Sequence, residues 1–162
     1  MRPSIKTGIT GLGLALGLAL AACGSGDAGP DAPLDCSMVT GVDTFVVGLE
    51  HHGAAGALDY KMMSVDPAPP IRGDNTWVLQ INAMASGVVG SPVDGASLAV
   101  TPFMPAHQHG TPIPVVVTPM ATAGQYMLSP VNLWMPGVWE TTIQATSGST
   151  TDSAVFKFCI PS

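Results

Sequence analysis

Apolar side chains recur at every second position in several short stretches of the chain. The clearest stretch is 76–83, where the alternating positions are Trp77, Leu79, Ile81 and Ala83. Alternation with a period of two is typical of a β-strand that buries one face. The same pattern predicts strands over 43–50, 58–65, 76–83, 96–103, 115–119, 124–130, 139–146 and 154–160. We therefore expect seven or eight short strands.

Turn-forming residues separate these stretches, as in the Pro-rich corner 66–75 and the polar segment 147–153. The chain has 19 Gly and 15 Pro, which in a polar chain would indicate disorder, but 46% of its residues are hydrophobic and argue for a packed core. Lys, Arg, Glu and Gln are too scarce for long amphipathic helices. The sequence predicts an all-β domain, specifically an immunoglobulin-like β-sandwich.

The first 22 residues have the features of a secretory signal peptide. Arg2 and Lys6 precede an uncharged apolar stretch that is too short for a comfortable membrane span. The exit Leu-Ala-Ala-Cys, ending at Cys23, resembles the lipobox of bacterial lipoproteins, in which the signal is removed and the cysteine is acylated. The resemblance implies attachment to a lipid bilayer through acylated Cys23, in the bacterial cell envelope, on the periplasmic side or at the outer membrane. The alternative is an ordinary signal peptide followed by a chance cysteine.

Two further cysteines lie at the two ends of the predicted domain, 36–162. Residues 23–35 are rich in Gly, Pro, Asp and Ala, which predicts a flexible tether before that domain. Outside the cytoplasm, the remaining pair Cys36 and Cys159 predicts a disulfide. It would close a loop of about 120 residues and contribute about 4 to 5 kcal/mol in the chain-entropy model. A thiolate metal site is the alternative, but neither cysteine has a Cys or His neighbour.

Acidic residues outnumber basic ones, and the formal net charge is −6. Without Arg2 and Lys6, three basic residues oppose 11 acidic ones, which gives −8. This balance argues against a nucleic-acid partner. The sequence also has no Gly-x-Ser-x-Gly nucleophile motif, and nothing places Glu50 and Glu140, its two glutamates, together as a carboxylate pair. We expect that the protein is not an enzyme.

The segment 104–110, Met-Pro-Ala-His-Gln-His-Gly, is the strongest candidate for chemistry. His107 and His109 are two positions apart, so an extended backbone would direct both imidazoles to one side, toward one metal ion. Met104 could add a thioether, and so could Met135 in a later Met-Pro turn. Imidazole with thioether suits copper, above all Cu(I). The alternative is that both imidazoles bond to loop backbone and that both methionines belong to packed structure.

His51 and His52 form a second histidine-containing segment. Adjacent residues of a strand point to opposite faces, so only one of the two imidazoles could join a shared site. We expect a structural role for this pair.

Three segments resemble the YtkA-like family: FMPAHQHG at 103–110, GQY at 124–126 and LWMPGVWE at 133–140. The family has Met-Pro-x-(Met/His)-x-His-Gly, Gly-x-Tyr and Met-Pro-Gly-x-Trp in the same order. The resemblance covers roughly residues 40–160 and implies a small extracytoplasmic immunoglobulin-like sandwich, often on lipoproteins. A further likeness in style to FixH-like and CopC-like copper proteins implies copper handling.

Carried over by position, the resemblance implies a metal site of Met104, His107, His109 and Met135. Ala106 and His107 stand where many relatives have Met and Gly before the histidine. We therefore expect a membrane-anchored copper chaperone, sensor or buffer. The alternative is a structural or interaction module that contacts another cell-envelope protein, and a weaker one is a carbohydrate- or peptide-binding sandwich with an exposed aromatic groove.

Overall fold

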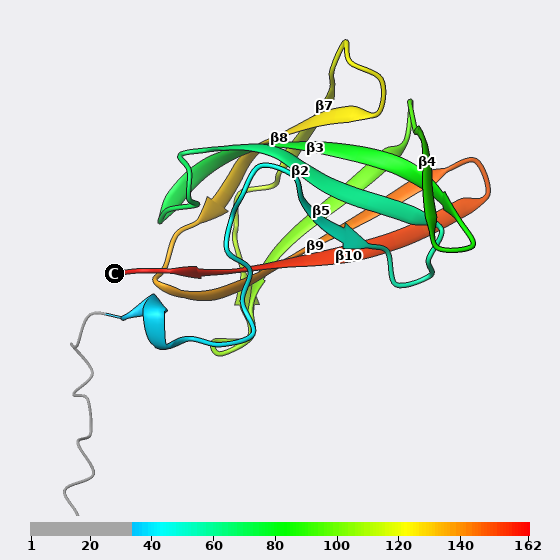
Figure 1. Ribbon diagram of the computed structural model, residues 1–162. Coiled ribbons are helices and arrows are strands. Elements are labelled where there is room, and N and C mark those ends of the chain that lie inside the picture. The colour runs from blue at the N-terminus through cyan, green and yellow to red at the C-terminus, as the bar shows by residue number, and fades with distance from the viewer. Residues whose placement is uncertain (1–33) are drawn as a thin grey trace, which may run out of the picture. The chain divides into compact units, whose positions relative to one another are not determined.

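Two antiparallel β-sheets account for most of the computed structural model, which describes residues 34–162 (Figure 1). A short 3-10 helix, η1 (Cys36–Met38), precedes the strands. The strands in chain order are β1 (Leu49–His52), β2 (Leu58–Asp66), β3 (Gly73–Ala85), β4 (Val88–Pro92), β5 (Ser97–Met104), β6 (His109–Gly110), β7 (Val116–Pro119), β8 (Gln125–Leu133), β9 (Gly137–Ser147) and β10 (Thr150–Ile160).

The strands pair into a six-stranded and a four-stranded sheet. The first sheet has the order β1-β2-β3-β8-β7, and β4 pairs with the last part of β3. The second has the order β10-β9-β5-β6. Figure 1 shows the two sheets as two layers, with β5, β9 and β10 beneath β2, β3 and β8. The predicted all-β class, with two sheets packed as a sandwich, is confirmed.

The core lies between the two sheets and consists of the side chains that the alternation pattern singled out. Trp77, Leu79 and Ile81 of β3 are fully buried, as are the corresponding side chains of β8, β9 and β10. Trp77 meets Phe158 of the opposite sheet edge to face, with ring centroids 5.6 Å apart. Edge-to-face contact is a favoured arrangement of aromatic rings, so this pair locks the two layers together.

Two short strands occupy segments that the sequence predicts as turn or loop. β4 follows β3 through Ser86 and Gly87, whose φ angles of 54° and 76° are those of a two-residue type I′ hairpin turn. Serine is an unusual residue for the first of these positions, so the sequence does not indicate a hairpin here. β6 returns along the end of β5 after the turn 105–108.

Two predicted boundaries are wrong. The strand predicted over 43–50 begins only at Leu49, since Gly48 has a φ of 89° that interrupts the extended backbone. The predicted turn 147–153 is mostly strand, because Ser147 already pairs with Thr150 at the start of β10. Polar side chains on the solvent face of an edge hairpin resemble a turn in the sequence.

The predicted disulfide between Cys36 and Cys159 is confirmed, with the two Cα atoms 5.6 Å apart. It joins η1 to the end of β10, beside the start of β9, where Val138 pairs with Cys159. We call this region the disulfide end of the sandwich. At the opposite end β9 turns into β10 between Ser147 and Thr150, and we call that region the hairpin end.

A buried carboxylate, Asp152, fastens the β1–β2 loop to β10 near the hairpin end. Its oxygens accept hydrogen bonds of 2.8 to 3.0 Å from the backbone N–H groups of Ala55, Ala57, Leu58 and Ser153. Burial raises the pKa of Asp152, but the four donors outweigh that effect and lower its pKa below the ordinary value. A Cβ atom at Gly53 would lie 2.2 Å from the same carboxylate, so only glycine fits there.

The predicted signal peptide 1–22, the acylated Cys23 and nearly all of the tether 23–35 lie outside the described residues. Within residues 34–162, no helix has the length and the hydrophobicity to cross a bilayer. The described residues 34–162 belong to one compact unit that contains every described strand, the core and the disulfide. We call this unit the body and expect it to fold without the preceding residues.

Candidate functional site

The candidate histidines lie on the tight turn that connects β5 with β6. The backbone N–H of His107 donates to the Met104 carbonyl at 3.2 Å, and that of Gln108 donates to the Pro105 carbonyl at 3.3 Å. Gln108 has a φ of 54°, which turns the chain back toward β6. The turn leaves His107 exposed and places His109 half-buried at the start of β6.

The His107 and His109 rings are close enough to bind one ion. Their centroids are 5.7 Å apart and the ring planes are inclined by 44°. Two imidazoles that each bind one ion through a nitrogen at about 2 Å have ring centroids about 5 to 6 Å apart. The two rings are neighbours because a turn brings them together, and not an extended segment as the sequence predicted.

Two tryptophans fix the His109 ring. Trp134, which is 43% exposed, stacks on it with a centroid distance of 5.2 Å and an interplanar angle of 25°. The buried Trp139 contacts the ring edge-on at 6.2 Å. His109 Nδ1 lies 3.0 Å from the Gly110 carbonyl oxygen, which can only accept a hydrogen bond. Nδ1 therefore carries a proton, and the lone pair of Nε2 is free to bind a metal ion.

The two methionines of the predicted site are placed differently. Met104 is 1% exposed and pairs directly with His109 across β5 and β6, so both side chains lie on the same face of the sheet. Its methyl group packs against the backbone of Gly137, where a Cβ atom would lie 1.8 Å from it. Met135 is half-buried against the core, and its carbonyl accepts a hydrogen bond of 2.9 Å from Trp139 Nε1. Trp139 thus links the Met135 turn to the His109 ring.

His51 and His52 point to opposite faces of β1, as their adjacency requires. His51 faces the second sheet, meeting Phe156 edge to face at 4.7 Å, and its Nε2 lies 3.0 Å from an oxygen of Asp43. His52 faces outward, and its Nδ1 lies 3.2 Å from an oxygen of Asp59 on β2.

Sequence reasoning missed the group to which His52 belongs. Glu50, His52 and Asp59 each offer a ligand atom, and these atoms lie within 4.8 Å of one another. Glu50 and His52 share a face of β1 by their spacing of two, which the sequence does reveal. Asp59 joins them only through the β1–β2 register, which pairs it with His52 and cannot be deduced from alternation.

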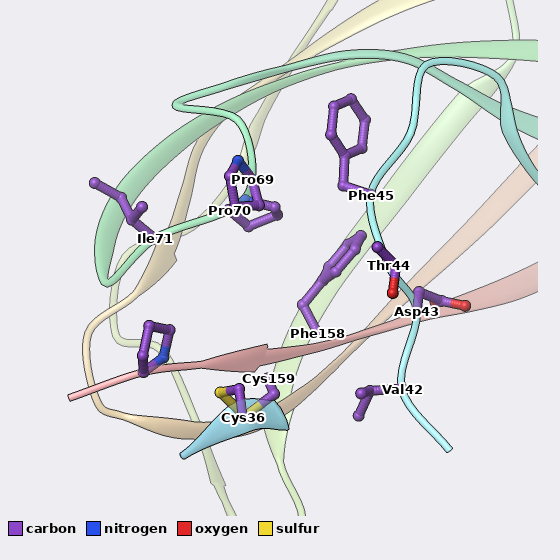
Figure 2. Close-up of a pocket in the computed structure, with 11 residues that line it drawn as sticks. Cys36, Val42, Asp43, Thr44, Phe45, Pro69, Pro70, Ile71, Phe158 and Cys159 are labelled. Carbon is purple, nitrogen blue, oxygen red and sulfur yellow. A yellow bond between two sulfur atoms is a disulfide. The ribbon is translucent and has the colours of Figure 1, made fainter. Parts of the chain in front are cut away.

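A mainly apolar hollow of about 310 Å³ lies beside the disulfide. Figure 2 shows Phe45 and Phe158 on one side of it and the Pro69–Pro70 segment on the other. The titratable side chain among its lining residues, Asp43, is already engaged by His51 and by the backbone N–H of Lys157. Among its lining residues, the hollow therefore presents no free ionisable side chain for catalysis or metal binding.

The sequence profile of the family described as YtkA-like matches residues 54–144, which is more than half of the chain. The match includes the β5–β6 turn, the Met135 turn and Trp139, but it excludes both disulfide cysteines, Glu50 and His52. Comparisons with curated proteins and with solved structures give no significant match.

Proposed function

Since the chain belongs to the YtkA-like family, we propose that it binds copper in the bacterial cell envelope through the β5–β6 turn. His107 and His109 are the imidazole ligands of this proposal, and Met104 and Met135 are the sulfur donors. The protein acts as a copper chaperone, sensor or buffer and not as an enzyme. The single observation that carries the proposal is the pair of neighbouring imidazoles, one of which has a fixed tautomer with Nε2 free.

The donor set fits copper better than it fits a hard cation. No carboxylate is among the proposed ligands, and imidazole with thioether favours copper, in particular Cu(I). Met104 lies opposite His109 in the β5–β6 pairing, on the same face of the sheet, so its sulfur is the first candidate to complete the site. Trp134 and Trp139 hold the His109 ring in place, which reduces the entropy lost when the ligands become ordered.

The extracytoplasmic location rests on three supports. The Cys36–Cys159 disulfide is typical of oxidising compartments. The first 23 residues resemble a lipoprotein signal with its acylation site, and the family resemblance implies the same compartment. In this proposal Cys23 attaches the body to the lipid bilayer.

The test is a copper titration of the body. Cu(I) is presented with a competing chelator under ascorbate, and Cu(II) is titrated separately. We expect one equivalent of Cu(I) bound by the wild type, and at least a hundredfold loss of affinity in the double variant His107→Ala/His109→Ala. Trp134 is stacked on His109, so Cu(II) binding at this site should also quench tryptophan fluorescence.

His52→Ala is the matched control, because it removes a histidine from the other sheet. It should leave the Cu(I) affinity and the quenching unchanged. If the double variant binds Cu(I) as tightly as the wild type, the β5–β6 turn is not a copper site. The function would then be sought in capture of another envelope protein.

A further inference from the structure

We infer that Glu50, His52 and Asp59 form a second metal site, for a borderline divalent cation of the Zn²⁺ class, on the outer face of β1 and β2. This inference is independent of the proposed copper site. The three ligand atoms lie within 4.8 Å of one another. Ligands that share one ion at about 2 Å lie about 3 to 4 Å apart, so a small adjustment of side chains closes the site.

Asp59 is the fixed ligand of this site. It alternates with the core residues Leu58 and Tyr60, so its side chain faces outward, and yet it is fully buried. One carboxylate oxygen accepts a hydrogen bond of 3.0 Å from Asn82 Nδ2, and the other lies 3.2 Å from His52 Nδ1. A carboxylate shielded from water is costly unless a cation or several donors compensate it. Asn82 and His52 are its hydrogen-bonding partners, and the charge of the neighbouring Lys61 also acts on it. None of these groups bonds to it as a divalent cation would.

Glu50 and His52 are the movable ligands. Both lie on an edge strand with exposed side chains, so both can rotate toward the fixed carboxylate. Glu50 already forms an ion pair with Lys61, whose ammonium group lies 2.9 Å from a Glu50 oxygen. The Lys61 ammonium group therefore competes with a metal ion for the same carboxylate.

The ligand types define the class of the ion. One imidazole and two carboxylates contain no sulfur, which disfavours Cu(I). The imidazole disfavours Mg²⁺ and Ca²⁺, which prefer oxygen ligands alone. Zn²⁺ accepts both nitrogen and carboxylate oxygen at about 2.0 to 2.2 Å and tolerates an open fourth position.

The experiment is a calorimetric titration of the body with zinc chloride. We expect one equivalent of Zn²⁺ in the wild type and at least a tenfold loss of affinity in His52→Ala and in Glu50→Gln. Both changes are at exposed positions, and the thermal unfolding temperature verifies that each variant is folded. Glu140→Gln is the matched control, since Glu140 pairs with Lys157 at 2.7 Å on the other sheet. It should bind Zn²⁺ like the wild type.

Lys61→Gln should change the Zn²⁺ affinity in the opposite direction. Removal of the competing ammonium group should tighten Zn²⁺ binding by up to about fivefold, the range of a surface ion pair. Lys157→Gln should leave the affinity unchanged. If Glu50→Gln and Glu140→Gln bind Zn²⁺ equally, or if binding is lost in His107→Ala/His109→Ala but kept in His52→Ala, the second site does not exist. The latter result would leave the β5–β6 turn as a site for both ions.

Discussion

The disulfide end and the hairpin end of the body are held closed by different chemistry. At the disulfide end a covalent bond joins η1 to β10. At the hairpin end the Asp152 carboxylate gathers four backbone N–H groups. The disulfide depends on the redox state of the surroundings, and the hydrogen bonds to Asp152 depend on their pH.

The two candidate metal sites also differ, in the groups that surround their histidines. His109 Nδ1 bonds to a neutral carbonyl, and its ring is stacked on an indole. His52 Nδ1 instead faces a buried carboxylate, with Glu50 beside it. In the two proposals the same side chain therefore binds a soft ion in one place and a borderline ion in the other. The surroundings of an imidazole, more than its presence, decide which metal it can select.

The largest effect should follow from opening the disulfide end. We expect Cys36→Ser/Cys159→Ser to lower the free energy of unfolding by about 2 to 5 kcal/mol, because the unfolded chain regains the freedom of a loop with sequence separation 123. Urea unfolding of the oxidised wild type and of the variant measures the difference. Reduced wild type should behave like the variant. A difference below about 1 kcal/mol would show that the disulfide contributes little to stability.

Removal of the Asp152 carboxylate should have a somewhat smaller effect on the free energy of unfolding. We expect Asp152→Ala to lower the free energy of unfolding by about 2 to 4 kcal/mol, because four backbone donors lose their acceptor. Urea unfolding at neutral pH measures the change. Asp94→Ala is a useful comparison, since Asp94 accepts from the backbone N–H of Gly124 alone among the described residues. Equal losses in the two variants would contradict the role of Asp152 as a shared acceptor.

Acid should weaken the hairpin end selectively. The pKa of Asp152 is lower in the folded state than its ordinary value of 3.8, so the unfolded chain takes up the proton first. The stabilisation is complete above pH 3.8 and is lost as the pH falls toward the lower folded pKa. We expect the stability difference between the wild type and Asp152→Asn to narrow over this range. A difference that stays constant from pH 6 to pH 3 would contradict this assignment.

The smallest predicted effect tests whether Met104 is a ligand or only a core residue. Met104→Leu keeps the buried volume, so the free energy of unfolding should change by less than about 1.5 kcal/mol. If its sulfur binds copper, the Cu(I) affinity should fall about tenfold, or about 1.4 kcal/mol. The competition titration measures that loss, and Zn²⁺ binding should not change. Unaltered Cu(I) affinity would remove Met104 from the ligand set.

The alternation of apolar residues was sufficient to predict the core strands, because burial of one face imposes it directly. It failed where other forces decide the backbone. Ser86 adopts a left-handed conformation in the β3–β4 turn, and the polar residues 150–153 are strand because they pair with β9. Neither feature has an apolar signature.

The candidate sites show the same limit. The closeness of His107 and His109 could be predicted, since both lie within one short segment. The stacking of Trp134 on His109 could not, because it joins segments 25 positions apart. The pairing of His52 with Asp59 depends on the strand register, which alternation leaves open. Local geometry is readable from a sequence, whereas contacts between strands require the fold.

The disulfide has a mechanical consequence. A pull on the chain at residue 34 reaches Cys36 after two residues and passes through the covalent bond into Cys159 on β10. Load from a preceding segment therefore bypasses the 122 residues between the two cysteines and does not peel the strands apart one by one. Force applied through the N-terminus would therefore enter the body at the end of β10, and the β5–β6 turn with its two histidines would lie outside the loaded path.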